Sequence, residues 1–220
     1  MGMRFPATSP IPDLDAMVVK LYETEPSLKL VSRVVDILRD GGVIIYPTDT
    51  LYAFGCDITH ARAVEKVCAL KNIDPAKMPL SFVCSSISHI SNYAKVDDRT
   101  FKILRSCLPG PFTFLLNGNA TLPKLFKKKS MVGVRIPDNG ITRAIVEALG
   151  NPLLSTSLFL NEDEPEYCTD PELIAEMYEQ RVDCVIDGGE GGIEPSTIID
   201  CTQGEPVVKR KGKGTFLYNG

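Results

Sequence analysis

Apolar residues recur along this chain at two different spacings, and the two alternate for most of its 220 residues. Across residues 28–42 the apolar positions are 30, 31, 34, 35, 37 and 38, which is the spacing of one helix face. The glycines at 41 and 42 predict where that helix ends. Residues 43–46 (VIIY) are apolar and mostly β-forming, so they predict a buried strand.

The same two patterns predict the remaining elements. Thr59 is the expected N-cap of the next helix, and Pro171 lies in the first turn of the last one. Further helices are expected over residues 59–72, 97–110, 141–152 and 170–180. Further strands are expected over residues 80–84, 112–116, 131–137, 153–159, 182–187, 196–200 and 206–210.

The order of these elements predicts the fold class. Strands and helices alternate, and several strands are apolar throughout, which is typical of a sheet covered on both faces. The last strands follow one another without room for helices between them. We therefore predict a single α/β domain with a twisted, mixed β-sheet and flanking helices. Residues 1–26 are expected to form an irregular leader, and residues 216–220 a C-terminal tail.

Composition and charge narrow the class of protein. The net charge of -4 predicts neither a nucleic-acid nor a membrane partner from the field of the whole molecule. No apolar stretch approaches the roughly 18 residues of a membrane span. Seven scattered cysteines without C-x-x-C spacing favour a reducing compartment, which we expect to be the cytoplasm, or an organelle after removal of a transit peptide. With two histidines and no ligand cluster, no protein-bound metal is expected.

Small hydroxyl and basic residues follow the ends of several apolar strands. They stand at 48–50, at 155–157, at Arg135 and at 209–211. In an α/β sheet, ligands lie beyond the strand ends, and Arg or Lys together with Ser or Thr suits an anionic ligand. Each of these residues alone also fits a turn, a surface ion pair or a frayed tail, so the hypothesis depends on their convergence. The motifs G-x-x-x-x-G-K-[ST] and G-x-G-x-x-G do not occur, so folds that depend on those loops are not expected.

A set of longer motifs resembles a known family. YPTDTLYAFGCD, residues 46–57, resembles the PT[ED]TxYGxG opening of the YrdC/YciO family, the threonylcarbamoyl-AMP synthase superfamily. LPGPFTFLL, VGVRIPDN, PLLSTSLF, PSTIIDCT and VVKRKGKG fall in the same order as later blocks of that family. The resemblance implies a YrdC-like domain over residues 27–215, in which the twisted sheet surrounds a large, concave, positively charged cavity.

The resemblance also implies an activity. The best-known members join bicarbonate to L-threonine as a carbamate, which attacks the α-phosphate of ATP to give threonylcarbamoyl-AMP and pyrophosphate for tRNA modification. ATP would then be the substrate or ligand, with Mg²⁺ held largely by phosphate and water oxygens. Such a nucleotidyltransferase needs positioning and charge stabilisation at phosphorus more than a dedicated base, because a carbamate is already a nucleophile.

Carried over residue by residue, the resemblance implies the two sides of this cavity. Lys71 and Ser157 would be catalytic. Thr48 and Tyr52 would line the amino-acid side, and Arg135 and Ser196 match recurrent cavity positions. The nucleotide side would be lined by Lys71, Thr113, Ser155, Thr156, Ser157 and Arg210.

Four positions differ from the synthase pattern and resemble the YciO branch. The family's K-x-R reads Lys71-Asn72-Ile73, and its later S-x-N reads Ser157-Leu158-Phe159. A histidine of typical synthases is replaced by Val83, and the glycine after the motif tyrosine by Ala53. Loss of these polar groups predicts a changed ligand, with a nucleotide or another anion still expected.

Two other functions are weighed against a nucleotide-binding enzyme. One is a module that binds double-stranded RNA or tRNA without synthase activity; the acidic net charge and the lack of interleaved aromatic residues count against it. The other is a carbamoyl-adenylate unit like that of hydrogenase-maturation carbamoyltransferases. The basic rim that RNA would require consists of Lys124, Lys127, Lys128, Lys129, Lys209, Arg210, Lys211 and Lys213.

Overall fold

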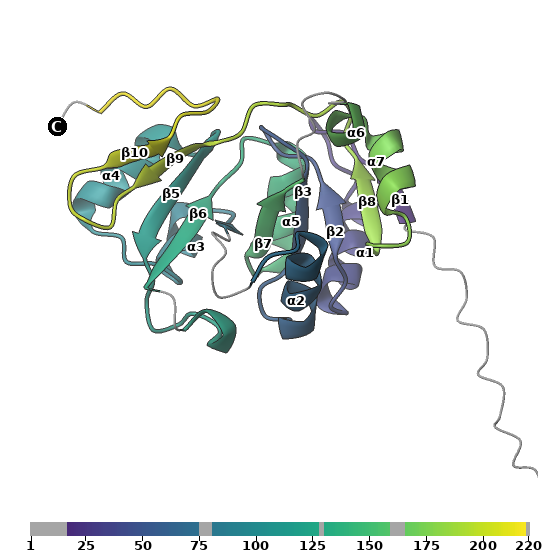
Figure 1. Cartoon of the computed structure of the whole chain (residues 1–220), viewed down its shortest axis with the longest axis horizontal. Helices are drawn as coiled ribbons and strands as arrows, with labels where there is room; N and C mark the ends of the chain where they lie inside the picture. Colours follow the sequence, from purple (N-terminus) through teal and green to yellow (C-terminus); the bar gives the residue numbers. More distant parts are fainter. Residues whose placement is uncertain (1–16, 75–80, 128–129, 159–165, 219–220) are drawn as a thin grey trace, which may run out of the picture.

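The computed structural model describes residues 17–74, 81–127, 130–158 and 166–218, which form one mixed α/β domain (Figure 1). Its strands are β1 (Met17–Lys20), β2 (Ile44–Tyr46), β3 (Ala53–Asp57), β4 (Ser81–Val83), β5 (Phe112–Asn117), β6 (Met131–Arg135), β7 (Leu153–Ser157), β8 (Cys184–Asp187), β9 (Thr197–Asp200) and β10 (Val207–Arg210). Its helices are α1 (Leu28–Arg39), α2 (Ala61–Leu70), α3 (Ile87–Ser91), α4 (Asp98–Cys107), the 3-10 turn η1 (Lys124–Phe126), α5 (Gly140–Leu149), α6 (Glu166–Thr169) and α7 (Pro171–Tyr178).

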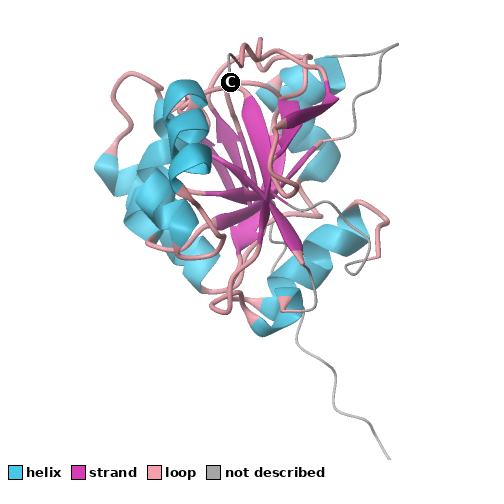
Figure 2. Ribbon diagram, turned by 90° about the vertical axis from the view of Figure 1, so that its left-hand side faces the viewer, coloured by secondary structure: helices cyan, strands magenta, loops and turns pink. Residues whose placement is uncertain are grey.

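All ten of these strands belong to one sheet, in the order β1-β8-β2-β3-β7-β4-β6-β5-β9-β10. The pairs β1·β8, β2·β8, β4·β6 and β5·β9 are parallel, and the other five pairs are antiparallel. The strands fan out strongly when seen end-on (Figure 2), which is the accumulated twist of a many-stranded sheet. The predicted fold class, a twisted mixed sheet with flanking helices, is confirmed.

Helices cover both faces of the sheet, and alternate residues of each strand point to opposite faces. On one face, α2, α3, α4 and α7 pack over Val43, Ile45 and the residues in step with them, forming a long continuous core. On the other face, α1 and α5 pack over Ile44 and Tyr46 and stop near β7. The second face therefore has helical cover over only part of its width.

The structure corrects the sequence prediction in several places. The expected irregular leader over 1–26 contains a strand, since Met17–Lys20 pairs in parallel with β8. The strand Ala53–Asp57 was not expected, although all five of its residues are buried. The N-cap of α2 is His60 and not Thr59, whose hydroxyl instead donates to Asp57 at 2.8 Å. The short elements α3, η1 and α6 were also not expected. Within the described ranges, no helix is long and apolar enough to cross a bilayer.

Candidate functional site

A cavity lies on the face that α1 and α5 only partly cover. It encloses about 740 Å³, counted out to its open mouth, which is within the usual range for a small-molecule site. Six strands that are neighbours in the sheet contribute to it: β7, β4, β6, β5, β9 and β10. The loop after β2 also contributes. Its lining residues are Thr50, Leu51, Ser81, Thr113, Leu115, Gly133, Arg135, Ser155, Thr156, Ser157, Pro195, Ser196, Ile198 and Arg210.

The floor of the cavity is a row of small residues on neighbouring strands. Ser81 pairs with Ser155 on one side and with Gly133 on the other. Because these side chains are small, the sheet surface is hollow here. At a distance of two residues along the same strands, the side chains of Val83 on β4 and Leu153 on β7 are fully buried under the helices. Sequence reasoning missed Ser81 and Gly133; the change from apolar to small residues at a spacing of two was the available signal.

One wall is the loop after β2, which begins with Pro47. The Thr48 hydroxyl accepts from the Thr50 amide at 3.1 Å and donates to the Leu51 carbonyl at 2.7 Å. Thr48 therefore closes its own loop, as Ser and Thr side chains do in tight turns. It lines a neighbouring cavity with Glu23 and Asp138, and Thr50 lies at the boundary of both cavities.

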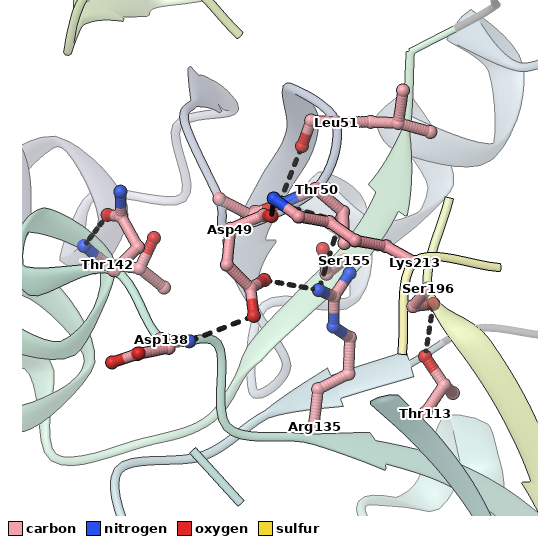
Figure 3. Close-up of polar contacts among 12 residues, drawn as sticks. Asp49, Thr50, Leu51, Thr113, Arg135, Asp138, Thr142, Ser155, Ser196 and Lys213 are labelled. Atoms are coloured by element: carbon pink, nitrogen blue, oxygen red, sulfur yellow. Dashed lines mark hydrogen bonds and ion pairs between the residues drawn. The ribbon is translucent and has the colours of Figure 1, made fainter. Parts of the chain in front are cut away.

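A buried ion pair ties this loop to the sheet (Figure 3). An Nη of Arg135 lies 2.8 Å from an Asp49 oxygen and 3.1 Å from the Thr50 hydroxyl. The second Asp49 oxygen accepts from the Asp138 amide at 3.0 Å, and the Asp49 carbonyl accepts from Lys213 Nζ at 2.7 Å. Among the described residues, the buried Nε of Arg135 has no hydrogen-bond partner. Asp49, Thr50 and Lys213, which hold this wall, were not among the predicted cavity residues, although residues 48–50 were noted at a strand end and Lys213 in the basic rim.

The opposite wall consists of hydroxyls and a second arginine. The Thr113 and Ser196 hydroxyls lie 2.8 Å apart (Figure 3), and both residues are buried. Arg210 donates to the Ser196 carbonyl at 2.8 Å and reaches its hydroxyl at 3.3 Å. Burial, and then the positive charge of Arg135, lower the pKa of Arg210. Two guanidinium groups thus face one cavity, an arrangement that favours an anion between them.

Lys71 and Ser157, which are far apart in the sequence, come together at the end of β7. Lys71 caps the C-terminus of α2, and its Nζ donates to the Ser157 carbonyl at 2.8 Å. Burial lowers the pKa of Lys71. The structure thus brings these two residues together, but of the two only Ser157 lines the cavity described above. Their catalytic and nucleotide-binding roles stay predictions.

The structure differs from the expectation at Tyr52. Its ring is fully buried, and its hydroxyl donates to the Gly189 carbonyl at 2.7 Å and accepts from the Gly188 amide at 3.1 Å. Tyr52 lines neither cavity described above. Its two hydrogen bonds instead stabilise the turn after β8. The other predicted cavity residues from β5, β6, β7, β9 and β10 do line the first cavity: Thr113, Arg135, Ser155, Thr156, Ser157, Ser196 and Arg210.

Three of the four replaced family positions lie in or against the core. Val83 and Ala53 are buried under α1 and α5, and Ile73 packs against the core of the opposite face. Phe159 lies outside the described residues, as do Lys128 and Lys129 of the basic rim. Within the described ranges, no group of three or more His, Cys, Asp or Glu residues could hold a metal ion.

Comparison with known proteins gives the family. Residues 36–212 match the model of the Sua5/YciO/YrdC family, described as "Telomere recombination". The protein YciO of Escherichia coli K12 is 40% identical over 196 residues, which are 88% of this chain and 94% of that protein. A protein of Haemophilus influenzae is 37% identical over 197 residues, which are 89% of this chain and 95% of its own length.

Solved structures of other proteins show the same fold. The crystal structure of E. coli YciO matches with a TM-score of 0.83 and 38% identity, over 91% of this chain and 97% of that one. P. abyssi Sua5 in complex with L-threonine matches with a TM-score of 0.78 and 24% identity, over 90% of this chain and 58% of that one. At that identity the second likeness concerns the fold.

Proposed function

This chain belongs to the Sua5/YciO/YrdC family, as predicted, and from that premise we propose that its cavity binds a nucleotide, ATP or AMP. One observation carries the proposal: the buried guanidinium group of Arg135, that of Arg210 and a row of hydroxyls converge on one cavity, and Lys71 contacts Ser157 at its edge. Guanidinium groups bind phosphate oxygens bidentately, and the hydroxyls supply further donors.

The reaction proposed for this site is transfer of an adenylyl group from ATP to a carbamate, as in threonylcarbamoyl-AMP synthesis. The residues around the cavity would position the α-phosphate and stabilise the charge that develops there. Mg²⁺ would enter with the phosphates of ATP and keep phosphate and water oxygens as its ligands. Ile73 and Val83 stand where the synthase pattern has an arginine and a histidine, and both pack in or against the core and do not line the cavity. We therefore expect weaker nucleotide binding than that pattern provides.

RNA binding is the second candidate, and contacts within the chain weaken it. Of the described basic rim, Arg210 is directed into the cavity wall, Lys213 donates to Asp49, and Lys209 pairs with Asp200. These three cations contact groups of the same domain, whereas the other described cations of the rim, Lys124, Lys127 and Lys211, stay available to a partner. A nucleotide in the cavity therefore fits the geometry better than a nucleic acid across its rim.

Calorimetric titration with AMP and ATP, with and without Mg²⁺, tests the proposal. Lys71→Ala and Ser157→Ala should each weaken nucleotide affinity about tenfold or more, since each loses a group facing the phosphates. Lys66→Ala, which removes an exposed amine paired with Asp183 on the other side of α2, is the matched control. Unchanged affinity in both site variants would refute the placement of the nucleotide.

Two further assays separate the remaining alternatives. Incubation with ATP, bicarbonate and L-threonine, followed by chromatography for pyrophosphate and adenylate, tests the adenylyl transfer; no product at high enzyme concentration would remove it. Titration with duplex RNA at low and moderate salt tests the second candidate. Tight binding with a steep salt dependence, together with no nucleotide binding, would favour the RNA module.

A further inference from the structure

The side chains of Tyr46 and Ser155 meet at the boundary between the helical core and the cavity. Tyr46 ends β2 and is completely buried under α1 and α5, while Ser155 lines the cavity on β7. The two hydroxyl oxygens are 2.7 Å apart. Gly55, on β3 between these strands, makes the contact possible, because a Cβ there would lie 2.6 Å from the Tyr46 ring.

Burial decides which hydroxyl donates. In the described residues, the Tyr46 phenol has no other hydrogen-bond partner, so its proton would be buried without an acceptor if Ser155 donated to it. Ser155 borders open space and can direct its own proton there. A hydroxyl has one donor and two acceptor sites, so a serine that accepts from Tyr46 still has its proton available.

We propose that Tyr46 is a positioning residue that holds Ser155 as a hydrogen-bond donor toward the cavity, so that the ligand places an unprotonated, anionic oxygen over β7. This inference rests on the proposed function and specifies which ligand group lies at this point. The oxygen belongs to a phosphate or to a carboxylate. Burial raises the pKa of Tyr46 to about 12, so the phenol remains a donor throughout the working pH range. The Arg135 guanidinium borders the same cavity and favours an anion.

A double-mutant cycle on ligand affinity tests the inference. Tyr46→Phe, Ser155→Ala and the double variant are titrated separately with AMP and with L-threonine. We expect Ser155→Ala to weaken one of these ligands about tenfold, because it loses a hydrogen bond to a charged group. Tyr46→Phe should weaken the same ligand about threefold, and the double variant should bind like Ser155→Ala alone. Ser155→Thr, which keeps a hydroxyl, should restore most of the affinity.

The ligand that shows this coupling identifies the oxygen: AMP indicates phosphate and L-threonine indicates carboxylate. Tyr178→Phe removes a phenol oxygen from the opposite face and should leave both affinities unchanged. Independent effects of Tyr46→Phe and Ser155→Ala, or no effect of either, would overturn the inference. If the wild type does not bind AMP, the proposed nucleotide binding fails, whatever the result with L-threonine. If it binds neither ligand, inorganic pyrophosphate replaces them, and absence of coupling with this bare anion overturns the inference as well.

Discussion

The two faces of the sheet have different roles even though the same strands form both. On one face α2, α3, α4 and α7 cover an apolar surface that continues from Val43, just before β2, to Ile199 on β9. On the other face the apolar surface under α1 and α5 gives way to serine, glycine and threonine between β7 and β9. One face holds the domain together, and the other combines a core with an open cavity.

The difference shows how the cavity is formed without a separate domain. Within β7, Leu153 is buried against the helices, and Ser155, two residues later on the same face, borders open space. Side chains in a strand repeat every two residues, so one strand can end a core and begin a cavity on one face. On the opposite face Leu154 keeps its apolar contacts.

The largest loss of stability is expected from a substitution in the core of the face that α2, α3, α4 and α7 cover. Phe82→Ala should lower the free energy of unfolding by about 3–5 kcal/mol, because Phe82 is fully buried and packs edge-on against Phe126 and Tyr93. Its neighbour Ser81 faces the cavity, and Ser81→Ala should change the same quantity by less than about 1 kcal/mol. Denaturant titration measures both variants. Equal losses would contradict the division of roles between the two faces.

The ion pair of the cavity wall should give the next largest effect. Asp49→Ala should cost about 3 kcal/mol, since it leaves the Arg135 charge buried beside the cavity without its partner. The remaining contact of Arg135 with the Thr50 hydroxyl limits the loss. Unfolding in low and high salt provides the measurement, and the loss should persist in salt because the pair is shielded from solvent. Disruption of the exposed pair between Lys66 and Asp183 by Lys66→Ala should cost well under 1 kcal/mol.

Gly55 tests the boundary between core and cavity. Gly55→Ala should cost about 1–3 kcal/mol, because its methyl group would collide with the Tyr46 ring in a fully packed region. Combining it with Tyr46→Leu should cost less than the sum of the two single variants, since the collision is then relieved. Simple additivity, measured by thermal unfolding, would show that the ring does not limit this position.

The smallest effect expected is on the pH dependence of stability, through His89. Burial lowers the pKa of His89, so protonation favours the unfolded chain. The stability it contributes is complete above the ordinary histidine pKa of about 6.5 and is lost as the pH falls through the lower folded value. Thermal unfolding between pH 8 and pH 5 should decline less in His89→Gln than in the wild type. His60→Gln is the control, and identical declines in all three proteins would contradict the assignment.

Many elements could be predicted because their patterns are local. Helix α1 repeats apolar residues at helical spacing, and Val31, Val34, Val35 and Leu38 are the residues it buries. The strand β3 could not be predicted in this way, since Ala53, Gly55 and Asp57 do not form a β-like pattern. It is a strand because β2 and β7 pair with it on either side. Tertiary pairing thus overrides weak local propensity.

The candidate site also has a part that the sequence predicts and a part that depends on the tertiary structure. The sequence by itself determined which chemical groups are present: the hydroxyls of β7, Arg135, Arg210 and the motif after β2. Only the tertiary structure decided which of them meet, because strand register and twist set the distances between residues far apart in sequence. The strand register places Ser81 between Ser155 and Gly133. Tyr52 instead binds the turn after β8 through its hydroxyl, outside the cavity. Strand pairing also places Tyr46, an ordinary core residue by sequence, against Ser155, which lines the cavity.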